Sequence, residues 1–301
     1  MARFLSLVCF LFCIPPMVAN ADFPDNNLDK QDAAIRKNLE KREMRATKTE
    51  EKFNYVIDSL ERIYKPIIEA FGAKFVVERD WNDSTVNAWA AKYGKNWTVH
   101  MYGGFFRRPE ITEDSFALVM CHEIHHLVGG MAFYSGSDMS AEGQADYAGN
   151  HVCARKLFLA APLNTLGRTA QLRSVLPQSV VDKCSRAWSK DLDRAVCLRS
   201  AKAGLELANV LGVMEGRRVS FDTPDNSVVR EIYESHPRAQ SRLDTYLAGS
   251  LCTKFVPDNI IPGLLAAVGY NSYQNEKASE PYNCYGKEDA RPASWFKSFL
   301  K

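Results

Sequence analysis

The sequence lacks the features that identify membrane-embedded and nucleic-acid-binding proteins. After residue 21 it has no apolar run that approaches the ~20 residues needed to cross a bilayer. It has no basic stripe with interleaved aromatics, because 38 Lys and Arg nearly balance 36 Asp and Glu and the formal net charge is +2. No internal repeats are evident. With 46% hydrophobic residues, the chain instead has the composition of a globular protein.

The first residues follow the pattern of an export leader. Arg3 precedes an apolar run over residues 4–14, which is followed by Pro15-Pro16 and the small residues Ala19-Asn20-Ala21. This order is typical of a secretory signal peptide that is cleaved after Ala21. We therefore predict that residues 1–21 are a signal peptide and that the protein is exported, either periplasmic or secreted.

Cysteine usage agrees with export. Six of the eight cysteines follow the leader, and an even number suits an oxidising compartment. We predict disulfides between Cys184 and Cys197 and between Cys252 and Cys284. Cys121 directly precedes a histidine and could supply a thiolate ligand. It points about 100° around a helix from that residue, so burial as a small apolar side chain is the favoured interpretation.

Residues 122–126 carry the strongest chemical signal, His-Glu-Ile-His-His, which follows the pattern His-Glu-x-x-His. His122 and His126 project from one face of a helix and can hold a single zinc ion. With one more protein ligand, a position stays open for water, whose pKa zinc lowers to about 7. Glu123 can then take the proton. This is the chemistry of peptide hydrolysis, and the alternative is a helix with merely packed histidines.

A further helix after the motif is expected to supply the third metal ligand. Glu142 and Asp146 are four residues apart, so one can bind the metal while the other hydrogen-bonds a ligand histidine. We predict Glu142 as the ligand and Asp146 as that partner, although most glutamates lie on the surface. Asp138 and His125 stay open as alternative ligands. His151 faces away from Glu142 on an ideal helix.

Hydrophobic periodicity outlines an α+β fold. Apolar residues recur at helical spacing over residues 53–67, and residues 74–78 favour a short strand. Residues 97–102 alternate between two faces, which indicates a second strand after a glycine-containing turn. The motif helix is expected to begin near Thr112-Glu113. A turn over residues 222–225 is expected to lead into a helix before His236.

These patterns divide the chain into four parts. After the signal peptide, residues 22–52 are predicted to form a charged helical arm. Residues 53–250 are predicted to form the metal-binding domain, and residues 251–301 a loop-rich, cysteine-containing tail.

Several segments together resemble a known family. Four landmarks occur in the order found in zinc metallopeptidases of the HtpX and CAAX-prenyl-protease type, a gluzincin family: Asn87-Ala88-Trp89-Ala90 with the strand at 97–102, the His-Glu-x-x-His helix, Glu142 to Asp146, and Ser235-His236-Pro237 with Arg242. The resemblance spans about residues 53–248. Because the chain has no second apolar run, it resembles the soluble exported branch of that family.

The resemblance implies a fold and a metal. It implies a mainly helical zincin-type metallopeptidase domain with a small sheet whose edge strand precedes the motif helix. It also implies that one Zn²⁺ per chain is bound by His122, His126 and Glu142, and that Glu123 is the general base and acid.

The same resemblance implies how a substrate is held. The edge strand at residues 97–102 would receive the backbone of a polypeptide substrate in extended form. His236 and Arg242 would reach toward the site and help to stabilise the oxyanion. The alternative is that His236 marks an ordinary helix start and that Arg242 pairs with a carboxylate.

The function expected from the sequence is therefore that of an exported zinc metalloendopeptidase that hydrolyses extended or misfolded protein segments. The alternative is a non-enzymatic envelope assembly or chaperone-like protein with a structural zinc. Glu123 favours the enzyme, because a structural site needs no base and is more often closed by four protein ligands.

Overall fold

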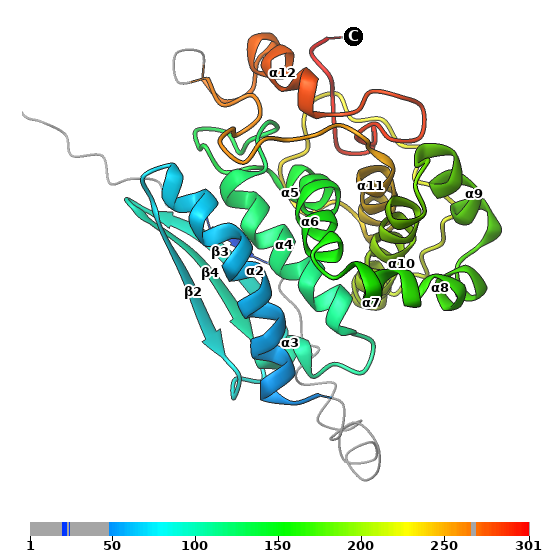
Figure 1. Cartoon of the computed structure of the whole chain (residues 1–301). Coiled ribbons are helices and arrows are strands. Elements are labelled where there is room, and N and C mark those ends of the chain that lie inside the picture. Colours follow the sequence, from blue (N-terminus) through cyan, green and yellow to red (C-terminus); the bar gives the residue numbers. More distant parts are fainter. Residues whose placement is uncertain (1–19, 23, 25–47, 266–268, 301) are drawn as a thin grey trace, which may run out of the picture.

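The computed structural model describes residues 20–22, 24, 48–265 and 269–300. About half of the chain is helical and the rest includes a small mixed sheet, so the expected α+β class is confirmed (Figure 1). Most of the predicted signal peptide and of the charged arm lies outside the described residues. In the described part, none of the helices combines the length and the apolar character needed to cross a membrane.

Three strands form the sheet, β2 (Lys74–Asp80), β3 (Ala88–Tyr93) and β4 (Asn96–Tyr102). β3 and β4 make an antiparallel hairpin, which turns at Gly94 with a positive φ of 60°. β2 pairs in parallel with the other side of β4. A three-residue strand, β1 (Asn20–Asp22), adds antiparallel to the outer side of β3.

The expectation that residues 97–102 form an edge strand is wrong. β4 is hydrogen-bonded on both sides, and β3 lies between β4 and the short β1. The reason is packing. Val99 and Met101 form an apolar face on β4. Phe75 and Val77 of β2 extend this face when β2 pairs beside β4, so the face is buried. β3, which packs against the motif helix, is paired with β4 on one side and with the short β1 on the other.

Helix α2 (Glu50–Ala70) covers this sheet together with the motif helix α4 (Glu113–Val128). Phe53, Val56, Ile57 and Leu60 are buried, as the predicted helical spacing requires, whereas Ile63 and Ile67 are only partly buried. Thr49 caps its first turn by accepting a hydrogen bond from the Lys52 amide.

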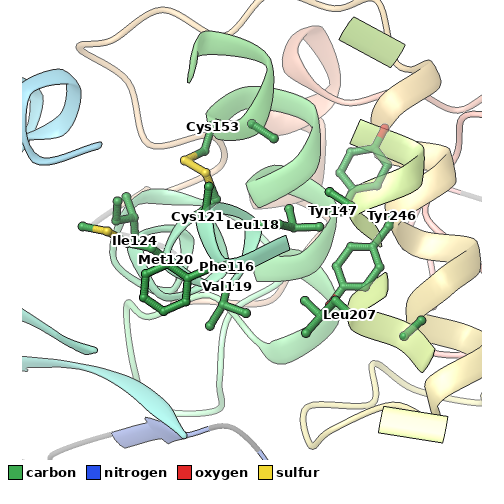
Figure 2. Packing of buried hydrophobic residues seen from close by; sticks show 14 of the residues in the cluster. Phe116, Leu118, Val119, Met120, Cys121, Ile124, Tyr147, Cys153, Leu207 and Tyr246 are labelled. Atoms are coloured by element: carbon green, nitrogen blue, oxygen red, sulfur yellow. A yellow bond between two sulfur atoms is a disulfide. The ribbon is translucent and has the colours of Figure 1, made fainter. Parts of the chain in front are cut away.

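Helix α4 runs through the centre of the molecule. It begins where expected, with a capping box between Thr112 and Ser115, and every residue after Glu113 is buried. Apolar residues project from it on several sides (Figure 2). α2, β3, α5 (Glu142–Ala148) and α10 (Asp191–Met214) pack around it. A helix enclosed in this way holds its side chains in fixed rotamers, which a metal site requires.

The remaining helices are short or lie on the far side of α4. They are α3 (Gly103–Phe106), α6 (Arg155–Leu159), α7 (Pro162–Gly167), α8 (Thr169–Val175), α9 (Gln178–Ala187) and α11 (Ala239–Leu251). The prediction of a helix before His236 is wrong, because residues 217–238 form an irregular segment and α11 begins only after Pro237. Asp225 instead donates its amide to Asp244 of α11, which holds this segment without a helix.

Three disulfides join the described cysteines. Cys184–Cys197 and Cys252–Cys284 are the two predicted pairs. Cys121 is buried, as predicted, but it is also bonded to Cys153, a pairing that was not predicted (Figure 2). α5 continues into the π-helix η2 (Gly149–Ala154), which lies against α4 and brings the two Cα atoms to 5.4 Å, within the range a disulfide needs.

Removing the Cys121–Cys153 disulfide is expected to destabilise the fold by about 4 kcal/mol, from the chain entropy that a cross-link across 32 positions removes from the unfolded state. Urea unfolding of a Cys121→Ala, Cys153→Ala variant measures this loss. The matched control is Cys184→Ala with Cys197→Ala, whose loop spans 13 positions and joins α9 to α10. Only the removal of Cys121–Cys153 should also weaken metal binding, because this disulfide joins α4 to η2. An unchanged unfolding free energy contradicts the prediction.

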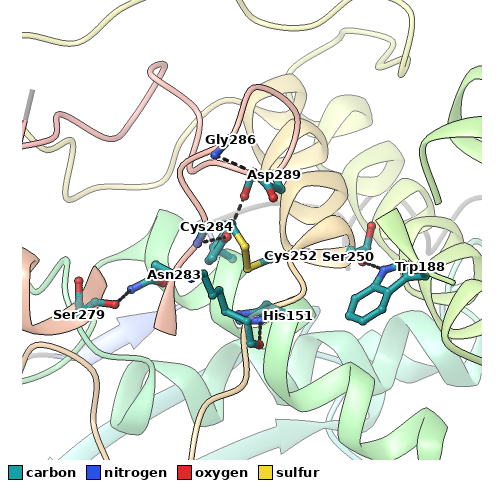
Figure 3. The surroundings of a disulfide bond; sticks show 11 residues. His151, Trp188, Ser250, Cys252, Ser279, Asn283, Cys284, Gly286 and Asp289 are labelled. Atoms are coloured by element: carbon teal, nitrogen blue, oxygen red, sulfur yellow. Dashed lines mark hydrogen bonds between the residues drawn. A yellow bond between two sulfur atoms is a disulfide. The ribbon is translucent and has the colours of Figure 1, made fainter. Parts of the chain in front are cut away.

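Within the tail, Cys252 directly follows α11 and bonds to Cys284, so this disulfide holds the tail at the end of α11 (Figure 3). Its helical parts are α12 (Tyr273–Ser279) and the 3-10 turn η3 (Glu280–Tyr282). Trp295 is fully buried and donates its indole N–H to Thr245. A Cβ atom at Gly143 would lie 2.2 Å from the Trp295 ring, so glycine is required there. The tail therefore supports α5 directly beside Glu142.

Candidate metal centre

His122 and His126 lie one turn apart on α4 and face the same space. Their Nε2 atoms are 2.9 Å apart, and both side chains are buried. With Glu123 they form a buried group whose ligand atoms lie close enough to hold a metal ion. Sequence spacing alone placed these side chains correctly, because the helix is regular through the motif.

The Nδ1 atom of each imidazole already has a hydrogen-bond partner. Nδ1 of His126 lies 2.8 Å from the carbonyl of Ser140, which can only accept, so this nitrogen carries a proton. Nδ1 of His122 lies 2.8 Å from Oδ1 of Asp146, the residue predicted as its partner. Both Nε2 atoms are thereby left to face each other, which is the orientation that metal-binding histidines adopt.

Glu142, the predicted third ligand, lies beside both histidines. Its Oε2 is 3.3 Å from Nε2 of His122, and its Oε1 is 3.7 Å from Nε2 of His126. α5 begins at Glu142, so the carboxylate sits in the first turn of that helix, where a negative charge is favourable. Among the described residues, Oε2 accepts no hydrogen bond.

The alternative ligands lie elsewhere. Asp138 is bound by Lys92 at 2.9 Å and is partly exposed. Nδ1 of His125 donates to the carbonyl of Cys121, and its ring contacts Tyr64. His151 hydrogen-bonds the carbonyl of Lys254. None of the three approaches the paired Nε2 atoms, whereas Glu142 does.

Asp146 is the centre of a buried hydrogen-bond network. It accepts two hydrogen bonds from Arg242, from Nε and Nη2, each at 2.7 Å. Tyr246 donates its hydroxyl to Oδ1 at 2.7 Å. Arg242 is 1% exposed and lies behind His122, with Nη2 at 3.4 Å from Nδ1. Its pairing with Asp146 matches the alternative interpretation, in which Arg242 pairs with a carboxylate.

His236 reaches the site from the irregular segment 217–238. Its Nε2 lies 3.2 Å from Oε1 of Glu142. The His236 side chain is 32% exposed, whereas His122, Glu123, His126 and Glu142 are at most 2% exposed.

These contacts shift the pKa values of the two imidazoles in opposite directions. Burial alone would lower the pKa of His122, but Asp146 and Glu142 outweigh that effect and raise it to about 10. Burial lowers the pKa of His126 to about 3. Burial also acts to raise the pKa of Glu142, yet the adjacent histidines hold it below its usual range. The place where the Nε2 atoms and Glu142 meet therefore attracts a positive charge.

The charges buried around this place fit a divalent cation. Glu123, Glu142 and Asp146 contribute three carboxylates, against one guanidinium from Arg242, and all four side chains are at most 1% exposed. With neutral imidazoles the formal charge is −2, and unbalanced buried charge is costly. Two imidazole nitrogens with a carboxylate oxygen are donors that zinc accepts.

Tyr134 is the residue that sequence reasoning missed. Its hydroxyl donates to Oε1 of Glu142 at 2.7 Å, and its ring stacks on His126 with centroids 6.0 Å apart. Burial, reinforced by the charge of Glu142, raises its pKa, so it is a neutral donor. It lies in the loop between α4 and α5, where no periodic pattern indicates which side chains turn inward.

Comparison with protein families, with curated proteins and with solved structures finds no match to this chain.

Proposed function

We propose that the protein is an exported zinc metalloendopeptidase that hydrolyses extended or misfolded protein segments. The observation that carries this proposal is the pair of Nε2 atoms of His122 and His126, 2.9 Å apart, with both Nδ1 atoms bound elsewhere and Glu123 next to them in the helix. Such a pair, in the pattern His-Glu-x-x-His, is the arrangement of a hydrolytic zinc site.

In this proposal His122, His126 and Glu142 hold the zinc. When bound, zinc supplies a Lewis acid that acidifies water and polarises the scissile carbonyl. Glu123, fully buried at the site, takes the proton from the attacking water and delivers it to the amine that leaves. His236, which is partly exposed beside Glu142, would help to stabilise the oxyanion, and Arg242 would support this role from behind His122, where it pairs with Asp146.

The edge of β3 supplies a place for an extended substrate. The segment Asn20–Asp22 pairs antiparallel with Trp89 to Ala91 on this edge, so β3 accepts a peptide backbone as an added strand. β3 also packs against α4. In our proposal a substrate strand takes the place of β1 beside β3, so β3 has the role that was expected of residues 97–102. The expected cleavage after Ala21 lies within β1.

Export is part of the proposal. Three disulfides among the described residues suit an oxidising compartment, and the leader pattern of residues 1–21 provides a route there.

The second candidate is a non-enzymatic assembly or chaperone-like protein with a structural metal. The three disulfides count against it, because they already stabilise the fold and leave less need for a structural metal. A structural zinc site is also more often closed by four protein ligands, whereas the proposed ligand set has three, His122, His126 and Glu142.

Removing the metal distinguishes the two. We expect a chelator to abolish cleavage of an unfolded protein substrate by the purified mature chain, and one equivalent of zinc to restore it. Circular dichroism should show that the disulfide-bonded fold persists. If the metal is only structural, no cleavage occurs in any state and chelation unfolds the chain. Cleavage that continues in excess chelator contradicts the proposal.

A further inference from the structure

Tyr134 lies between the two helices that carry the proposed ligands. Its backbone is fixed, because its amide donates to the carbonyl of Met139 and its carbonyl accepts from Ser137. The side chain points back toward α4, where the ring stacks on His126 at an interplanar angle of 17°. The hydroxyl then reaches Oε1 of Glu142.

The two oxygens of Glu142 differ as a result. Oε1 accepts from Tyr134 at 2.7 Å and lies 3.2 Å from His236. Oε2 lies nearest to Nε2 of His122, and no described residue donates to it. A carboxylate can bind a metal through one oxygen or through two, and a hydrogen bond on one oxygen selects the other.

We propose that Tyr134 is a positioning residue that fixes Glu142 as a one-oxygen ligand, with Oε2 directed at the metal. This rests on the proposed function only in taking Glu142 as a ligand. Tyr134 also shields His126 on its ring face, so a single side chain orients one ligand and packs on another.

A contact outside the site holds this arrangement in place. Glu234 accepts the amide of Ser135 at 2.7 Å and its hydroxyl at 2.6 Å. Ser135 follows Tyr134, and Glu234 precedes His236 by two residues. Glu234 therefore fastens the loop of Tyr134 to the segment of His236, which keeps both donors on the same oxygen of Glu142.

The decisive experiment measures zinc binding by the mature protein rather than cleavage. We expect Tyr134→Phe, which keeps the ring and removes the hydroxyl, to weaken zinc binding by about 10- to 100-fold, the usual effect of losing a hydrogen-bond partner of a ligand. Competition with a chromophoric chelator measures the affinity. Zinc X-ray absorption should show one carboxylate oxygen in the wild type and a changed oxygen shell in the variant.

Tyr64→Phe is the matched control. Tyr64 is also buried against α4, beside His125, but among the described residues its hydroxyl has no hydrogen-bond partner. Zinc affinity should be unchanged in this variant. Zinc affinity equal to wild type in Tyr134→Phe overturns the inference.

Glu234→Ala provides a second variant that leaves Tyr134 intact. Losing the two hydrogen bonds to Ser135 should weaken zinc binding by about two- to tenfold, because the loop then holds Tyr134 less firmly. Zinc bound as tightly as in the wild type would contradict the role of this contact. If zinc affinity falls in both variants but the wild type hydrolyses no peptide, the proposed function fails and the positioning role stands.

Discussion

Glu123→Gln is expected to reduce peptide hydrolysis by about 10²- to 10⁴-fold, the usual contribution of a general base, while zinc stays bound. Glutamine has the same shape as glutamate but cannot accept a proton. Because Glu123 is fully buried beside His122, its replacement by an isosteric amide should leave the packing of α4 intact. The loss should therefore fall on kcat.

The measurement pairs cleavage of an unstructured protein with metal analysis of the same sample. Glu113→Gln is the matched control, because Glu113 lies at the start of the same helix and makes only a half-exposed ion pair with Lys52. It should cleave as the wild type does. Undiminished cleavage by Glu123→Gln would refute the role of Glu123 and the proposed mechanism. If the variant loses zinc together with activity, Glu123 is instead a ligand of the metal.

The part of the site that lies on one helix could be predicted from the sequence. His122 and His126 are set by helical geometry, which depends only on neighbouring residues. The pairing of Glu142 with Asp146 on α5 follows in the same way, because both residues belong to one turn. For such residues spacing fixes direction, and no knowledge of distant contacts is needed.

Features that depend on tertiary contacts could not be predicted in this way. The spacing of Cys121 gives its direction on α4, but only the packing of η2 against α4 shows that Cys153 lies opposite. Likewise, the alternation of residues 97–102 is the same for an edge and a central strand, and the pairing with β2 decides between them. Tyr134 was missed for a related reason, since loop side chains follow no period.

The irregular segment 217–238 shows why the helix expected before His236 is wrong. Two of its backbone amides donate to side chains of α11 rather than to a helical backbone. The Ser220 amide donates to Gln240, and the Asp225 amide donates to Asp244. The segment also uses its backbone to hold the tail, because Tyr233 donates to the carbonyl of Trp295. These partners are distant in sequence, so turn propensity alone did not reveal them.

The second large effect is expected at Asp146. Asp146→Ala should lower the free energy of unfolding by about 3–5 kcal/mol, because it leaves the buried Arg242 without its carboxylate. The hydroxyl of Tyr246 loses its acceptor as well. The same change frees Nδ1 of His122, so zinc binding should weaken by about 10- to 100-fold. Urea unfolding and zinc competition measure the two effects separately.

A double variant separates the lost charge pair from the lost packing. In Asp146→Ala with Arg242→Met no charge is left unpaired, and a methionine fills much of the space of the guanidinium stem. We expect it to recover a large part of the stability that Asp146→Ala loses, because breaking a buried pair costs more than removing it whole. Zinc affinity should stay low, since His122 still lacks its partner. A double variant less stable than Asp146→Ala would show that Arg242 contributes by packing and not by its pairing with Asp146.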